Sequence, residues 1–182
     1  MFDTSYIYHL VDHKAVPIYG VLESWLYKFT TTKKRYLVIV ERYQYNIYVI
    51  KFYADCHALS KNKYNLLLKD EQPAPIIRTC INIMLEFFAL NPRASFGFIG
   101  AASVNKTRKG KIVSEGKENT QRFRVYQTLM FNFFGQETFE HSQNVRRSAY
   151  LLINRQNQPI DGFKARAEEM FRQMYLNLEE QQ

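Results

Sequence analysis

The chain of 182 residues has the length of one domain, and with 46% apolar residues it can bury a core without metal ions or disulfides. Its 13 tyrosines and 14 phenylalanines exclude disorder along the whole chain. The net charge of +8 favours a polyanionic partner, such as nucleic acid or a phosphate-bearing ligand, and leaves open a charge that serves solubility alone.

The N-terminal residues lack the basic and continuous apolar regions of a secretory signal, and no stretch reaches the ~18 apolar residues of a membrane span. We therefore expect a soluble, cytoplasmic protein with no membrane partner. Cys56 and Cys80 lie in apolar surroundings, which predicts two buried free thiols. His9 and His13 would share a helical face, but no acidic or cysteine cluster completes a site, so we expect no metal.

Two runs rich in Val, Ile and Tyr, residues 36–42 and 46–53, flank a short turn and predict an antiparallel hairpin. Residues 21–29 are predicted as a further strand, with a helix as the alternative because two bulky residues are adjacent there. Residues 64–69 are predicted as a short strand. The first third of the chain is therefore expected to build antiparallel sheet.

A helix is predicted next, because Pro73 and Pro75 suit a first turn and the pair Asn91-Pro92 ends the pattern. Apolar residues recur inside it at three- and four-residue spacing, which predicts one buried stripe. The residues of this stripe are Ile77, Ile81, Met84, Leu85 and Phe88.

Residues 93–102 are predicted as a strand with glycines, residues 119–134 as a helix ending at Gly135, and residues 145–154 as a late strand. A last helix covers about residues 162–178, with Asp161 as its cap. The resulting fold class is α+β: one mixed sheet with an N-terminal antiparallel hairpin, then strand, helix, strand, helix and strand, with the helices packed on the sheet.

We expect a single domain over residues 1–182, with a basic flexible insertion at 103–118 and a C-terminal helix with a frayed tail at 160–182. The two glycines of GFIG lack the spacing of a dinucleotide-binding loop, and a basic stretch follows them in place of a helix. Gly97 and Gly100 are therefore expected to mark close packing within the strand.

The segment from Ser103 to Arg124 holds seven basic and two acidic residues, a net charge of +5. Such a loop can contact phosphate groups, whereas a solvated surface loop is an equal alternative. Arg146 and Arg147 precede the late strand and could extend the same surface. The candidate anion-binding or nucleic-acid-binding residues are Lys106, Arg108, Lys109, Lys111, Arg122, Arg124, Arg146 and Arg147.

From about residue 36 to residue 154, the order of elements resembles the fold of the GNAT-type N-acyltransferases. In that family the second helix commonly begins with an Asn and carries a Tyr seven residues later. The segment NTQRFRVY places Asn119 and Tyr126 at this separation. The resemblance implies a GNAT-like sheet, acyl-CoA as the cofactor, and Tyr126 as the general acid that protonates the leaving thiolate.

The glycine-rich pyrophosphate loop of the family is replaced by KDEQPAPIIR, which contains no glycine and two acidic residues. Its two prolines cannot donate a backbone N–H to phosphate. The basic insertion is also long for the family, and Gly135 lies too far after Tyr126. The resemblance therefore implies a divergent member that has lost its cofactor site.

Three functions follow from these patterns. The first is a non-catalytic GNAT-like binding or interaction domain without a cofactor. The second is nucleic-acid binding through the basic 103–124 segment, with tyrosines available to stack on bases. The third is an acyl-CoA-dependent N-acyltransferase that uses Tyr126. The many aromatic residues also leave a homo-oligomer open.

Overall fold

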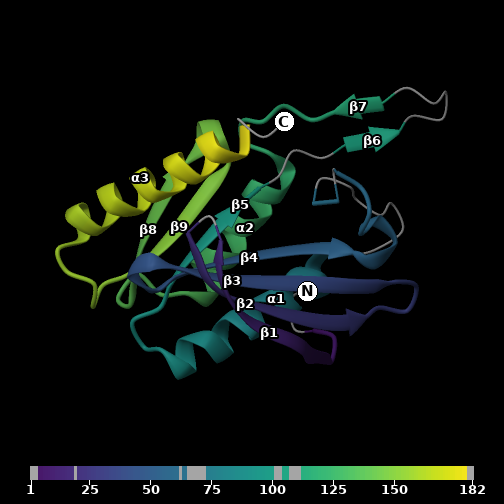
Figure 1. The fold of residues 1–182 in the computed structure, drawn as a ribbon, viewed down its shortest axis with the longest axis horizontal. Helices are drawn as coiled ribbons and strands as arrows, with labels where there is room; N and C mark the ends of the chain where they lie inside the picture. Colours follow the sequence, from purple (N-terminus) through teal and green to yellow (C-terminus); the bar gives the residue numbers. More distant parts are fainter. Residues whose placement is uncertain are drawn as a thin grey trace.

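The structure, a computed structural model, is an α+β fold in which helices cover both faces of a mixed seven-stranded sheet (Figure 1). It describes residues 4–18, 20–61, 63–64, 73–100, 104–106 and 112–179. The strand order is β1-β2-β3-β4-β5-β9-β8. The strands of this sheet are β1 (Tyr8–Ile18), β2 (Val21–Thr30), β3 (Arg35–Tyr43), β4 (Ile47–Ala54), β5 (Ser95–Ile99), β8 (Phe139–Asn144) and β9 (Ala149–Asn154). The predicted α+β class is confirmed.

β3 and β4 form the predicted antiparallel hairpin, in which Tyr43 pairs with Ile47. The 3-10 turn η1 (Gln44–Asn46) joins them, and two of its residues have positive φ angles, 61° at Tyr45 and 56° at Asn46. β2 pairs antiparallel with β3 from Glu23 to Thr30, so the strand interpretation of residues 21–29 is correct and the helical alternative is wrong.

α1 (Pro73–Leu90) begins and ends where its prolines predict. Ile77, Ile81 and Met84 are buried as predicted, whereas Leu85 is 37% exposed. Leu85 was wrongly assigned, because the buried face turns toward Ile83 and Phe87 and leaves Leu85 beside solvent. Phe88 is partly buried and its ring is tilted against that of Phe139, with centroids 5.3 Å apart.

α2 (Gln121–Phe133) packs on the same face of the sheet as α1. Its apolar face is buried, since Phe123, Leu129 and Met130 are fully buried and Phe134 follows them into the core. The alternate residues of β5, Phe96 and Phe98, point to this face and join the same core cluster.

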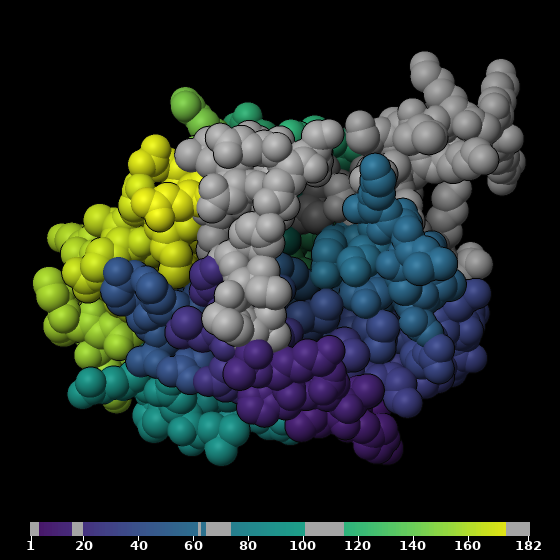
Figure 2. All heavy atoms as spheres, viewed as in Figure 1, coloured from purple at the N-terminus to yellow at the C-terminus, as the bar shows by residue number. Residues whose placement is uncertain are grey.

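α3 (Ile160–Glu179) covers the opposite face, where Phe163, Ala167 and Phe171 pack on β4 and β9 (Figure 1). A Cβ atom on Gly97 would lie 3.3 Å from the ring of Phe171, so this glycine does mark close packing between helix and strand. Figure 2 shows η1 against α3, where the guanidinium of Arg166 lies 5.4 Å from the ring of Tyr45.

The start of α3 differs from the prediction. The helix begins at Ile160, so Asp161 lies in its first turn instead of capping it. A carboxylate in the first turn still interacts favourably with the helix dipole.

The sheet has two edge strands that the sequence analysis did not predict. β1 pairs with β2 along one edge, and β8 pairs with β9 along the other. The predicted late strand, residues 145–154, is shorter at its start, because Val145–Arg147 form the 3-10 turn η3 between β8 and β9. An edge strand carries many polar residues, so the alternating pattern that identifies a strand is weak there.

β5 is shorter than the predicted strand at 93–102, and residues 101–102 lie outside the described part of the chain. Within the predicted basic insertion, β6 (Val104–Lys106) and β7 (Ile112–Ser114) pair antiparallel as a separate ribbon that projects beyond the sheet (Figure 1). Tyr64 lies in a turn, and the rest of the strand predicted at 64–69 is outside the described residues.

The two cysteines differ in their surroundings. Cys80 is buried in the core, where burial raises the pKa of its thiol to about 12. Cys56 is exposed, so its predicted burial is wrong; it lies in the short 3-10 turn η2 (Asp55–His57) at the end of β4. No helix in the described ranges is long and apolar enough to cross a membrane.

Candidate functional site

β4 and β5 are the parallel pair at the centre of the sheet, and they pair over only three residues at their amino ends. The pairing starts at Ile47 with Ser95 and, among the described residues, stops at Val49 with Gly97. β4 then continues to Ala54 paired with β3 but not with β5. The carboxyl ends of these two strands therefore diverge, and the amino end of α2 lies beside the end of β5.

Gly100, directly after β5, is hydrogen-bonded to Thr120, directly before α2. Its carbonyl accepts a hydrogen bond from the Thr120 hydroxyl at 2.7 Å, and the same hydroxyl accepts one from the Phe123 N–H at 3.2 Å. A Cβ on Gly100 would lie 2.7 Å from the Phe123 nitrogen, so only glycine fits there. Thr120 thus caps the helix and fixes it to the strand.

The GNAT resemblance implied that α2 begins at Asn119, but the helix begins at Gln121. Asn119 precedes the Thr120 cap, is exposed, and has a positive φ of 49°. Both Asn and Thr are good helix caps, and the sequence gives no reason to prefer one. The buried Thr120 is selected here because its hydroxyl bonds to strand and helix at once.

Tyr126 lies in the core of the fold, only 6% exposed. Its ring centroid lies 5.3 Å from that of Phe98, which is near the end of β5. Burial raises the pKa of its hydroxyl well above the usual value, and the charge of Arg122 opposes this shift only in part. The position suits packing, and a general acid needs contact with its substrate.

Arg122 is placed away from the other basic candidates. Its guanidinium lies 5.5 Å from the ring of Phe52, and Nη1 donates to the backbone carbonyl of Tyr64. Burial lowers the pKa of this guanidinium. Arg122 therefore joins α2 to the far end of β4 and to the turn at Tyr64, and it does not project into solvent as a surface phosphate contact would.

Four other basic residues gather at one end of the sheet. Lys117 is held beside η3 because its carbonyl accepts from the Ser148 hydroxyl at 2.8 Å, and the Asn119 N–H donates to the Val145 carbonyl at 3.0 Å. Both arginines of η3 are exposed, as is Arg124 of α2, whose Nη1 donates to the Asn119 carbonyl at 2.6 Å. We call this set, Lys117, Arg124, Arg146 and Arg147, the basic surface.

The remaining basic candidates lie on or near the ribbon. Lys106 ends β6, whereas Arg108, Lys109 and Lys111 lie outside the described residues. The fold thus places two of the predicted anion-binding residues, Arg146 and Arg147, near a third, Arg124. Arg122 lies apart from them.

Within the described part of the chain, no group of three His, Cys, Asp or Glu side chains could hold a metal ion. His9 and His13 lie on a strand instead of the expected helical face. His141 bonds to the Tyr150 hydroxyl at 2.5 Å and to the Phe134 carbonyl at 3.0 Å, and burial lowers its pKa.

A groove that the sequence analysis did not predict lies where the end of α1 meets β1, β2, β3 and the start of β4. Its volume is about 490 Å³. We call it the Trp25 groove; its lining includes Glu23, Trp25, Arg42, Glu86, Phe87 and Asn91. It lies beside the amino end of β4, at the opposite end of that strand from the divergence of β4 and β5.

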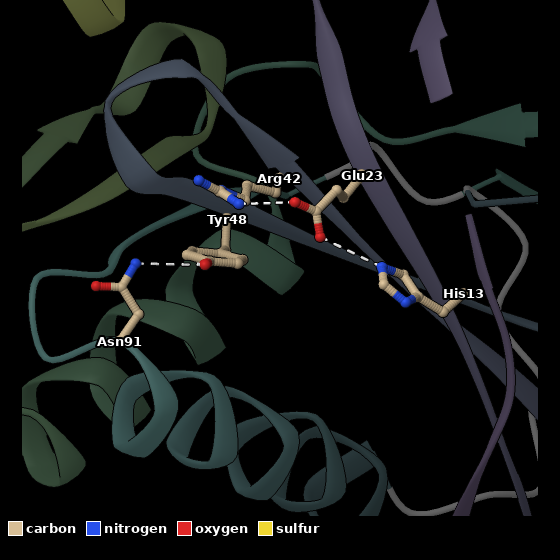
Figure 3. Close-up of polar contacts among 5 residues, drawn as sticks. All are labelled: His13, Glu23, Arg42, Tyr48 and Asn91. Atoms are coloured by element: carbon tan, nitrogen blue, oxygen red, sulfur yellow. Dashed lines mark hydrogen bonds and ion pairs between the residues drawn. The ribbon is translucent and has the colours of Figure 1, made fainter. Parts of the chain in front are cut away.

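A polar network lies along one side of the groove (Figure 3). Arg42 Nη1 donates to Glu23 Oε1 at 2.7 Å, and His13 Nε2 lies 3.2 Å from Glu23 Oε2. Asn91 Nδ2 donates to the Tyr48 hydroxyl at 3.4 Å. The buried Nε of Arg42 has no hydrogen-bond partner among the described residues.

The floor of the groove is aromatic. The ring of Phe87 lies 4.9 Å from that of Trp25 and 5.2 Å from that of Tyr48. One signal for this groove was present in the sequence: Glu23 shares the face of β2 with Trp25 and Tyr27, where a charged side chain on a largely apolar face is unusual.

A scan against protein-family models, a search of curated proteins and a search of solved structures found no match to this chain.

Proposed function

We propose that this chain is a non-catalytic binding domain with a GNAT-like architecture. The order of its strands supports the likeness: four antiparallel strands lead to a parallel pair, β4 and β5, whose carboxyl ends diverge. α1 connects this pair and α2 follows it, as in the predicted order of elements.

The burial of Tyr126 is the observation that carries the non-catalytic part of the proposal. A general acid must come within hydrogen-bond distance of the atom that it protonates. Tyr126 is surrounded by core side chains of β5 and α1, and its pKa is raised by burial. Pro73 and Pro75 in the first turn of α1 remove two N–H donors that would otherwise bind phosphate.

Acyl transfer provides the test. The protein is incubated with acetyl-CoA and a mixture of primary amines, and the coenzyme A released is measured by its thiol. We expect this release to stay at the level of the protein-free blank. Tyr126→Phe should give the same result and should leave the unfolding midpoint nearly unchanged, because the ring that fills the core is retained. Turnover by the wild-type protein that is lost in Tyr126→Phe would identify an acyltransferase.

A second candidate function is the binding of single-stranded nucleic acid, and the basic surface favours it. Hydrogen bonds from Ser148 and Asn119 fix Lys117 beside η3, so the backbone presents these cations in one place. Cations held on one surface neutralise several phosphates, and binding then weakens steeply with salt.

For this second candidate, we expect the Arg146→Ala/Arg147→Ala variant to weaken binding of a labelled single-stranded oligonucleotide in fluorescence polarisation. The slope of log K against log salt should fall by about 1 to 2, because two phosphate contacts are lost. Arg93→Ala/Lys164→Ala removes the same charge at the opposite end of the sheet and should leave this slope unchanged. Equal slopes in all three proteins would exclude the basic surface.

A further inference from the structure

The Trp25 groove is acidic although the protein is strongly basic. Its lining contributes two carboxylates, Glu23 and Glu86, against the one guanidinium of Arg42, while the chain carries a net charge of +8. Burial and then the charge of Glu86 raise the pKa of Tyr27, which lines the groove. Glu86 itself lines the groove, so its negative charge favours a cation there.

Existing contacts already use part of the hydrogen-bond capacity of the two carboxylates, and this bears on which cation the groove can bind. Glu23 already contacts Arg42 through Oε1 and His13 through Oε2, and Glu86 Oε1 accepts from the Tyr8 hydroxyl at 2.5 Å. A primary ammonium has three N–H donors, and each of them needs an acceptor when it is desolvated. A quaternary ammonium has no N–H group and therefore no such need, because it is attracted by charge and by aromatic rings alone.

The apolar parts of the groove fit the body of such a ligand. Trp25 and Phe87 meet edge to face at the floor, and the lining also includes Leu90, 83% exposed, and Leu10, 54% exposed. The volume of about 490 Å³ is within the usual range of small-molecule sites.

We propose that the Trp25 groove binds a small organic cation that carries a quaternary ammonium group. Its charge is attracted to Glu86 and Glu23, and its methyl groups contact Trp25 and Phe87. The charge of the groove, opposite in sign to that of the whole protein, selects this occupant over an anion. The site is separate from Tyr126 and from the basic surface, so it stands independently of the proposed function.

Trp25 is the single tryptophan of the chain, and its indole N–H signal in an NMR spectrum therefore reports on this groove alone. We expect choline and benzyltrimethylammonium to shift this signal in a saturable way. The uncharged isostere of choline, 3,3-dimethyl-1-butanol, should bind at least about fivefold more weakly because it lacks the charge. Glu86→Gln should raise the dissociation constant for choline about fivefold.

Glu137→Gln is the matched control, since it removes one exposed carboxylate after α2 and should leave choline binding unchanged. The proposal is overturned if the indole signal does not respond to either cation, or if the uncharged isostere binds equally well. An unchanged dissociation constant in Glu86→Gln would also overturn it. If a trimethyllysine peptide binds more tightly than choline, the occupant is a protein segment and not a small ligand, and this result also contradicts the proposal.

Discussion

Gly100→Ala is expected to lower the free energy of unfolding by about 3 kcal/mol, because the added methyl group overpacks a closed contact. Its Cβ would lie 2.7 Å from the Phe123 nitrogen and 2.7 Å from the Thr120 hydroxyl oxygen. Relief would require α2 to move away from β5, which would break the bond from Thr120 to the Gly100 carbonyl. Urea unfolding followed by far-UV circular dichroism measures this loss.

Gly135→Ala is the control for this prediction. A Cβ there would meet no described atom within 4 Å, so the variant should be as stable as the parent or more stable by about 0.4 to 1 kcal/mol. Equal losses in the two variants would show that the contact at Gly100 does not fix α2 to the sheet.

Asn154→Ala is expected to cost about 3 kcal/mol of stability, because it leaves buried backbone groups without partners. Asn154 is fully buried at the end of β9. Its Nδ2 donates to the Pro92 carbonyl at 2.6 Å and to the Ala94 carbonyl at 3.3 Å, and its Oδ1 accepts from the Gln156 N–H at 3.0 Å. These bonds join the chain that enters β5 to the chain that leaves β9.

The thermal unfolding midpoint of Asn154→Ala should therefore fall well below that of the parent. Asn132→Ala offers the comparison, since Asn132 is exposed on α2 and alanine has the higher helix propensity. A midpoint for Asn154→Ala within error of the Asn132→Ala value would contradict the assigned role of the buried amide.

The central elements of the fold were predictable because local patterns specify them. α1 has prolines in its first turn, a terminating Asn-Pro and an apolar stripe, and β3 and β4 are rich in β-branched and aromatic residues around a short turn. The edge strands β1 and β8 lack such a pattern. β8, FEHSQN, buries only Phe139 completely, so its sequence resembles a loop.

The candidate sites were less predictable because distant residues build them. Glu23 and Glu86 reach one groove although 63 positions separate them, and no local pattern indicates this contact. Arg122 stands among basic neighbours in the sequence, yet its helical position turns it toward Phe52 and away from Arg124. Arg146 and Arg147 remain candidates, and their closeness to Lys117 depends on backbone bonds to η3.

Titration calorimetry with acetyl-CoA is the most direct test of the proposal that this domain binds without catalysing acyl transfer. We expect no saturable heat at micromolar to millimolar acetyl-CoA, because the first turn of α1 contains Pro73 and Pro75 and Tyr126 is enclosed by the core. Saturable binding with a micromolar dissociation constant would contradict the account and would restore acyl-CoA as the cofactor.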